Sequence, residues 1–248
     1  MCGRYVSPSE QDIERFWDLP GSDRRFPAQY NVAPTMPVPI VHRDQHAGGA
    51  KSVTLARWGL IPFFWKAAKP PGHSFNARLE EAADKPMWRL PFRNARCIVP
   101  ASGWYEWQER EQVNRETGEL NKYKQPYFMH LPENRLLGLA GLMAWTKAAG
   151  SDQWTASCTI LTTAASGSAA QIHHRMPVAL MEAAHDAWLD PNLNDPEAVQ
   201  ALIAEHQLAL AIAKHAVSTR VNGSRTDDAS LIDSVPPLHP DTPKPFTA

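Results

Sequence analysis

The residues with the clearest chemical potential stand at the amino terminus, in the run Met1-Cys2-Gly3-Arg4. Cysteine is small, so we expect the initiator methionine to be removed and Cys2 to become the first residue. Cys2 would then carry a thiol and an α-amine on adjacent carbons, with ordinary pKa values of about 8.5 and about 7.7–8.0. Such a pair converts an aldehyde to a Schiff base and then to a thiazolidine ring. Judged by position alone, a cysteine at residue 2 can also be incidental.

A second candidate is the run Ser102-Gly103-Trp104-Tyr105-Glu106-Trp107. Alternate residues of a β-strand share one face, so Trp104, Glu106 and Gln108 point the same way. A carboxylate among bulky aromatic side chains loses contact with water, which raises its pKa towards the range of a general acid. The alternative is a surface glutamate on a half-exposed strand.

The run Ile172-His173-His174-Arg175-Met176-Pro177 holds two adjacent histidines and an arginine. In an extended chain His173 and His174 would point to opposite faces, so they are poorly placed to bind one metal ion together. One histidine could transfer a proton while the other faces solvent, and Arg175 could hold an anion. The alternative is a polar loop that precedes a proline.

The run Ser74-Phe75-Asn76-Ala77-Arg78 lies in a basic stretch, since residues 51–110 contain 10 Lys/Arg and 5 Asp/Glu. Asn76 can orient a carbonyl or hydroxyl group, and the forked guanidinium of Arg78 can bind a phosphate. Just upstream, the aromatic residues of 58–66 stand among cations, a combination that suits unstacked bases and a phosphate backbone. Core packing of some of these aromatic residues is the alternative.

Composition sets the limits within which these residues act. The 248-residue chain is 43% hydrophobic, which suffices for a globular core, and its 22 Pro and 13 Gly favour many turns and short elements. The net charge of −1 excludes a generally basic coat, although residues 181–248 hold 4 Lys/Arg against 10 Asp/Glu and leave the middle basic. Three cysteines without a CxxC pair favour a reducing compartment over a disulfide framework or a structural zinc site. No apolar run approaches the roughly 20 residues of a membrane span, and the amino terminus lacks a signal peptide.

Short β-strands and a few helices must position these groups. Ser9 can cap a helix that places Ile13 and Trp17 on one face, and Asp195 can cap a second helix that begins at Pro196. A further helix is expected at 181–189. Strands are expected at 38–42, 53–58, 96–100, 103–108, 127–131, 136–145 and 154–162. Residues 109–125 indicate an elongated hairpin or loop insertion, and the prolines from Pro236 onwards an extended tail.

Taken together, these segments resemble the SRAP family, the SOS-response-associated peptidase proteins. The resemblance runs in order from residue 2 to about residue 222. The matching pieces are Met1-Cys2-Gly3-Arg4-Tyr5, Tyr30-Asn31-Val32-Ala33-Pro34, Trp58-Gly59-Leu60-Ile61-Pro62, Asn76-Ala77-Arg78, Ser102-Gly103-Trp104-Tyr105-Glu106-Trp107, Leu161-Thr162-Thr163-Ala164, Ile172-His173-His174-Arg175-Met176-Pro177, Val217-Ser218 and Val221-Asn222. The stretches at 65–76 and 109–125 are long for the family.

The resemblance implies an α+β fold: a single β-rich domain at 1–235 with a barrel-like core and a few peripheral helices, followed by a Pro-rich tail at 236–248. Family members bind abasic sites in single-stranded DNA and join their amino-terminal cysteine to the sugar aldehyde as a thiazolidine. This covalent protein–DNA linkage shields the lesion during the DNA damage (SOS) response, and some members reverse it. For this chain we therefore expect no cofactor, no metal and no membrane, a monomer, and a cytoplasmic location, at the nucleoid if the source is bacterial.

The resemblance also implies roles for individual residues. Cys2 would be the nucleophile, Asn76 would position the sugar or the Cys2 amine, Glu106 would move protons, and His173 would be the catalytic histidine, whereas His174 would be dispensable. The residues expected to bind DNA are Arg4, Asn31, Pro34, Trp65, Arg78, Thr162 and Arg175. Arg4, Arg78 and Arg175 would contact phosphates, Asn31, Pro34 and Thr162 would line the groove, and Trp65 would stack beyond the lesion.

Two alternatives belong to other classes of function. In a cysteine peptidase, Cys2, His173 and Glu106 would be nucleophile, base and partner, and the removal of Met1 by the chain itself would be the simplest reaction. That reading leaves the arginines and aromatic residues unexplained, and we expect no general peptidase activity. A non-covalent module for single strands or modified bases would explain the basic middle but would leave Cys2, Glu106 and His173 without roles.

Overall fold

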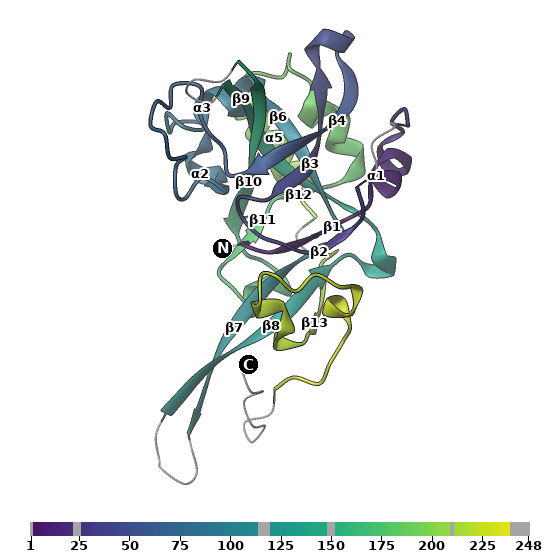
Figure 1. Ribbon diagram of the computed structural model, residues 1–248, viewed down its shortest axis with the longest axis vertical. Coiled ribbons are helices and arrows are strands. Elements are labelled where there is room, and N and C mark those ends of the chain that lie inside the picture. The colour runs from purple at the N-terminus through teal and green to yellow at the C-terminus, as the bar shows by residue number, and fades with distance from the viewer. Residues whose placement is uncertain (1, 22–25, 114–119, 148–151, 209–210, 239–248) are drawn as a thin grey trace.

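The computed structural model describes residues 2–21, 26–113, 120–147, 152–208 and 211–238 (Figure 1). Within them, five strands form a closed barrel: β3 (Pro37–Asp44), β4 (Ala50–Trp58), β6 (Arg96–Ala101), β9 (Leu137–Lys147) and β10 (Trp154–Ala164). β10 closes the ring because it pairs in parallel with β4 and antiparallel with β9. The remaining neighbours, β3–β4, β3–β6 and β6–β9, are antiparallel.

Three short strands extend the barrel. β5 (Asn76–Arg78) runs parallel to β10, with Ile160 opposite Asn76 and Thr162 opposite Arg78. β11 (Arg175–Pro177) is antiparallel to the last residues of β10, and β12 (Ala179–Leu180) pairs with β9. The carboxyl end of β10 therefore lies between β5 and β11. Residues from three separate parts of the chain, those of β5, β10 and β11, lie side by side there.

A second sheet has the strand order β13–β8–β7–β1–β2. Its members are β1 (Tyr5–Ser7), β2 (Gln29–Val32), β7 (Gly103–Val113), β8 (Leu120–His130) and β13 (Ala213–Ala216). β7 and β8 pair from Trp104–Met129 to Val113–Leu120, and this hairpin projects away from the barrel at the bottom of Figure 1. The hairpin expected at 109–125 is thus confirmed for its strands, while its tip at 114–119 lies outside the described residues.

The helices are short and lie on the periphery. α1 (Glu10–Trp17) begins as expected at Ser9, whose side chain accepts a hydrogen bond from the amide of Asp12. α5 (Pro196–His206) begins behind Asp195, which caps the amide of Ala198. The stretch at 181–189 divides into a 3₁₀ turn, η4 (Glu182–Ala184), and α4 (His185–Leu189). The other helical elements are α2 (Leu79–Ala82), α3 (Arg89–Asn94), η1 (Gln45–Ala47), η2 (Pro132–Asn134), η3 (Ala169–Gln171), η6 (Thr219–Asn222) and η7 (Ala229–Ile232).

The largest apolar cluster joins the inside of the barrel to the second sheet. Trp58 of β4, Trp104 of β7, Met129 of β8 and Ile160 of β10 are all fully buried in it, and so is Cys2. The expected fold class, a single β-rich domain with a barrel-like core and a few short helices, is confirmed. No helix in the described part of the chain is both long and apolar enough to cross a membrane.

The carboxy-terminal segment is fastened to the second sheet by polar contacts. Asn31 is 1% exposed, and its side-chain amide donates to the carbonyls of Val221, Gly223 and Thr226. Further along, the amide of Leu238 donates to Oε1 of Gln125 at 2.6 Å. The start of the expected tail therefore contacts β8, and residues 239–248 lie outside the described part of the chain.

At Gly103 the backbone of β7 packs tightly against β8. A methyl group at this position would overlap the carbonyl oxygen of Met129 and the ring of Phe128. We therefore expect Gly103→Ala to lower the free energy of unfolding by about 1–3 kcal/mol, measured by urea denaturation. Gly72→Ala is the matched control, because nothing lies within 4 Å of the added methyl, and its effect should stay within about 0.5 kcal/mol. Equal effects at both positions would contradict this packing argument.

Candidate active site

Cys2 lies in the interior because β1 occupies the middle of a sheet. β1 pairs with β2 on one side and with β7 on the other, so the residues before it run into the space between this sheet and the barrel. Cys2 is 0% exposed, and its carbonyl oxygen accepts a hydrogen bond of 2.7 Å from Nδ2 of Asn76. Oδ1 of Asn76 is buried and has no donor among the described residues. The backbone of Cys2 is thus fixed by Asn76, and the Oδ1 of Asn76 remains as a hydrogen-bond acceptor beside it.

The end of β10 brings four of the predicted residues together. Asn76 and Arg78 lie on β5, opposite Ile160 and Thr162 of β10. Arg175 begins β11 on the other side, and one of its Nη atoms donates to the Thr162 carbonyl at 2.6 Å. Thr162 is 2% exposed, so it holds Arg175 from the buried side of the strand. Arg78 is exposed.

Arg175 is already engaged by a carboxylate. Its two Nη atoms donate to the two oxygens of Glu80 at 2.7 and 2.9 Å, and its side chain is 11% exposed. Glu80 was not a predicted residue. Its pKa is lowered, first by the hydrogen bonds from Arg175. An arginine held in this forked geometry presents the arrangement that also binds phosphate.

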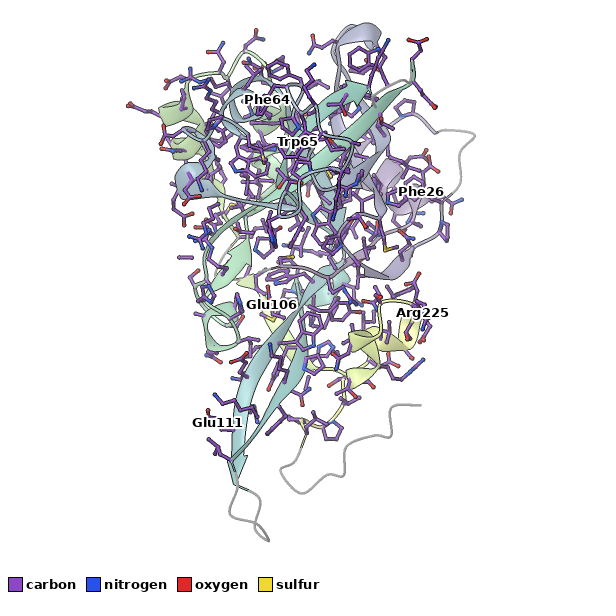
Figure 2. All side chains as sticks on the ribbon, turned by 60° about the vertical axis from the view of Figure 1, so that its left-hand side comes forward. Phe26, Phe64, Trp65, Glu106, Glu111 and Arg225 are labelled. Atoms are coloured by element: carbon purple, nitrogen blue, oxygen red, sulfur yellow. The ribbon has the colours of Figure 1, made fainter. Side chains whose placement is uncertain are left out.

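Glu106 projects from β7 into the same region and is 4% exposed (Figure 2). Burial raises its pKa to about 7, and the positive charge of the amino terminus acts in the opposite direction. Near neutral pH this carboxyl can therefore both donate and accept a proton. Burial also raises the pKa of the Cys2 thiol, to which the charge of Glu106 adds, while the amino terminus lowers it.

The two adjacent histidines do not point to opposite faces, so this expectation was wrong. After η3 the backbone is still turning, and the amide of His173 donates to the carbonyl of Ala169 at 3.0 Å. As a result, the ring centroids of His173 and His174 lie 4.3 Å apart at an interplanar angle of 31°. The expectation had assumed an extended chain.

The backbone of Arg175 holds the ring of His173 in place. Its amide donates to Nδ1 of His173 at 3.0 Å, and its carbonyl oxygen lies 3.2 Å from the same nitrogen. Burial, and after it the positive charge of the amino terminus, lowers the pKa of His173. The ring is therefore kept neutral near pH 7. A lowered pKa at His173 and a raised pKa at Glu106 are typical of a site that moves protons.

A pocket of about 820 Å³ is lined by Glu106 and His173, whereas Cys2 and Asn76 are not among its lining residues. Trp107 lines it and donates from Nε1 to Oδ1 of Asn222 at 2.7 Å. Neither of these residues was given a role from the sequence, although both lie in motifs that carry the family resemblance. The full lining is Glu106, Trp107, Gln108, Glu109, Lys124, Gln171, Ile172, His173, His174 and Asn222. Another pocket, of about 620 Å³ beside Trp145 and Trp154, contains no predicted residue.

The other predicted residues have different surroundings. Arg4 donates to Oδ1 of Asn31 at 2.8 Å and to the Val221 carbonyl at 3.0 Å, next to the carboxy-terminal segment. Pro34 is half-buried in the turn after β2. Trp65 is half-buried, donates from Nε1 to the Lys69 carbonyl, and lies far above Glu106 in Figure 2. The described residues contain no cluster of three or more potential metal ligands.

Comparison with known proteins shows the family of the chain. The family model for SOS response associated peptidase (SRAP) matches residues 1–224. The chain belongs to the SRAP family. It is 34% identical to the abasic site processing protein YoqW of Bacillus subtilis (strain 168), over 94% of this chain and 100% of that protein. It is 32% identical to the abasic site processing protein HMCES of Gallus gallus, over 82% of this chain and 65% of that protein.

Solved structures share the fold of this SRAP protein. A Bacteroides thetaiotaomicron protein superposes with a TM-score of 0.74 at 20% identity, over 95% of this chain and 100% of that chain. A phage-related protein of Bordetella bronchiseptica does so with a TM-score of 0.64 at 28% identity, over 88% of this chain and 95% of that chain. The predicted family is thereby confirmed, whereas the roles of the individual residues remain predictions.

The raised pKa of Glu106 has a consequence for stability. In the unfolded chain this carboxyl ionises near its ordinary pKa of 4.5, but in the folded protein only near 7. The wild type therefore loses stability as pH rises from 4.5 through 7, because a buried charge forms. We expect Glu106→Gln to be more stable than wild type by roughly 1–3 kcal/mol at pH 8, with the difference vanishing below pH 4.5.

Urea denaturation across this pH range measures the difference. Glu133→Gln is the control: Glu133 is exposed in η2, so its pH profile should run parallel to that of the wild type. A Glu106→Gln variant whose stability difference does not change with pH would show that the carboxyl is not desolvated as described.

Proposed function

We propose that this SRAP protein processes abasic sites in single-stranded DNA by linking Cys2 covalently to the sugar aldehyde. The observation that carries the proposal is the burial of Cys2, held by Asn76, in the same region as a carboxyl group whose pKa is about 7. The printed names of the relatives, abasic site processing proteins, support the class of substrate. The linkage would shield the lesion during the DNA damage response.

Recognition of the DNA would rest on phosphates and on the space left by the absent base. The pocket of about 820 Å³ can receive a sugar that carries no base, and an abasic nucleotide in a single strand is easily turned out of its stack. Arg4, Arg78 and Arg175 would contact the flanking phosphates. Binding would therefore be sensitive to salt and largely independent of sequence.

The bidentate pair at Arg175 would change when DNA binds. A phosphate could take the place of the Glu80 carboxylate, because both groups present two oxygens to the guanidinium. Asn31 and Thr162 are almost fully buried, so their part would be to hold Arg4 and Arg175 in place.

The covalent chemistry first requires the aldehyde. In the closed sugar, protonated Glu106 would donate to the ring oxygen and, once ionised, would take the proton of the C1 hydroxyl. The Nε2–H of neutral His173 would donate a hydrogen bond to the oxygen of the opening sugar. Asn76 Oδ1 would accept from the Cys2 amine after Met1 has been removed, which aims the nitrogen at C1.

Ring closure then completes the linkage. The Cys2 nitrogen attacks C1, and the aldehyde oxygen leaves as water, which gives an imine. Sγ of Cys2 next adds to the same carbon, forming the C–S bond of the thiazolidine, and the nitrogen remains as a secondary amine. Both amine protons leave in the water that is released with the imine, and the thiol proton then moves to the nitrogen, so the reaction needs no oxidant, reductant or metal. The same steps in reverse would release the DNA.

A general peptidase reaction is not part of this proposal. Cys2 is 0% exposed, so either a sugar or a peptide would reach its sulfur only after a local shift, and the arginines of the site favour DNA over a peptide as the substrate. Removal of Met1 by the protein itself remains part of the proposal, because the Met1–Cys2 peptide bond adjoins the thiol. We further propose that the protein acts as a monomer in the cytoplasm, on nucleoid DNA in a bacterial cell.

Substitution of Cys2 gives the direct test. We expect wild-type protein to form an adduct with an abasic single strand that survives denaturation without any reducing treatment. Cys2→Ala keeps an α-amine but has no sulfur, so it should give an adduct only after borohydride reduction of the imine, while its non-covalent affinity stays within a few-fold. Denaturing gels with both proteins decide the matter. A yield of adduct from Cys2→Ala that equals the wild-type yield without borohydride would contradict the proposal.

A further inference from the structure

Two cations lie side by side on the face of the second sheet that carries Glu106. Arg110 follows Glu106 by four residues on β7, so it projects from the same face about 13 Å further along the strand. Lys214 on β13 is opposite Met129, which in turn is opposite Trp104 on that same face. Tyr127 connects the two: Nη2 of Arg110 donates to its hydroxyl at 3.0 Å, and Nζ of Lys214 lies 5.6 Å from the centre of its ring.

Only neutral groups contact these cations in the described part of the chain. Nε of Arg110 donates to Oε1 of Gln108 at 2.8 Å, and Nζ of Lys214 donates to Oε1 of Gln171 at 2.7 Å. No carboxylate among the described residues forms an ion pair with either side chain. Burial, and after it the positive charge of Arg110, lowers the pKa of Lys214, so the two charges repel each other.

The neighbouring charges on the hairpin are neutralised. Lys124 pairs with Glu109 and Lys122 pairs with Glu111, each at 3.1 Å. Unlike these lysines, Arg110 and Lys214 have no carboxylate partner among the described residues. Both are half-buried, which makes their lack of a counter-ion more costly than it would be for exposed side chains.

The cation pair is joined directly to the lesion pocket. Gln108 and Gln171, which bind Arg110 and Lys214, both line the pocket, and Nε2 of Gln108 donates to the carbonyl of Gln171 at 2.9 Å. A DNA strand that leaves the pocket along the hairpin would pass Arg110, and Lys214 lies on the other side of Tyr127 from Arg110. Figure 2 shows this direction, from Glu106 towards Glu111.

We propose that Arg110 and Lys214 form an anion site for a backbone phosphate of the DNA strand that continues past the abasic nucleotide along the β7–β8 hairpin. This inference rests on the proposed function, since it assumes that the lesion occupies the neighbouring pocket. A phosphate would supply the missing counter-charge and relieve the repulsion between the two cations. The long hairpin would thereby extend the DNA-binding surface on one side of the lesion.

Neutral variants test the site. We expect the double variant Arg110→Gln/Lys214→Gln to bind intact single-stranded DNA at least about tenfold more weakly at low salt, with a salt slope smaller by about 0.7–1.4. Arg110→Lys should recover most of the loss from Arg110→Gln, because it restores the charge. The matched control is Lys147→Gln at the far end of β9: its Nζ also lies over an aromatic ring, 5.3 Å from the centre of Trp154, but away from the pocket. It should leave affinity and slope unchanged.

The length of the DNA locates the contact. Wild-type protein should lose affinity when the strand is cut back to the lesion on one side but not on the other, and the double variant should not respond to that cut. The proposal would be overturned if the double variant had the same salt slope as the wild type. It would also be overturned if the double variant still bound more weakly than the wild type to the strand that has been cut back. If wild-type protein formed no adduct with abasic DNA, the proposed function would fail, while the binding of intact DNA would still decide the role of the cation pair.

Discussion

The arrangement of the site depends on the burial of the amino terminus. Chain ends usually lie on the surface, but here β1 is enclosed between β2 and β7, and Cys2 is held inside by the hydrogen bond from Asn76 to its carbonyl oxygen. This bond fixes the backbone of Cys2 and, in the proposed function, would leave the thiol and, after removal of Met1, the amino group for chemistry. The end of β10 serves the same purpose, because it aligns β5 with β11 and so places Asn76 and Arg175 at one corner. Holding an aminothiol in this way replaces an encounter in solution by a high local concentration.

Burial tunes the chemistry of this corner as well as its geometry. It raises the pKa of Glu106 to about 7 and lowers that of His173, so that near neutral pH the carboxyl can exchange protons while the imidazole stays neutral. The same desolvation makes an ionised Glu106 unfavourable for folding. At a pH where Glu106 is ionised, the protein is thus less stable than it would be with an uncharged side chain at this position. Such a loss of stability is common at functional sites. Arg175, the other charged side chain of this corner, has its charge balanced by the carboxylate of Glu80.

Much of the fold could be predicted from the sequence, and four of the predicted site residues meet at the end of β10, while the roles of all site residues remain predictions. Strong local signals marked the caps at Ser9 and Asp195 and the longer strands, and the ordered motifs indicated the family. The strands β1, β2, β5 and β11 were not predicted, because three or four residues are too few to show an alternating pattern. Tertiary contacts decided the rest: no local signal marks the pairing of β9 with β10 that closes the barrel, the contact between the rings of His173 and His174, or the ion pair of Arg175 with Glu80.

The central claim, that a free Cys2 aminothiol forms the linkage, is tested most directly by the intact mass of the protein before and after incubation with single-stranded DNA that carries one abasic site. The account predicts that the protein lacks Met1, and that the adduct weighs the sum of protein and DNA less one water without any reduction. Peptide mapping should place the DNA on Cys2. Retention of Met1 together with an adduct, or an adduct located on a lysine, would contradict the account.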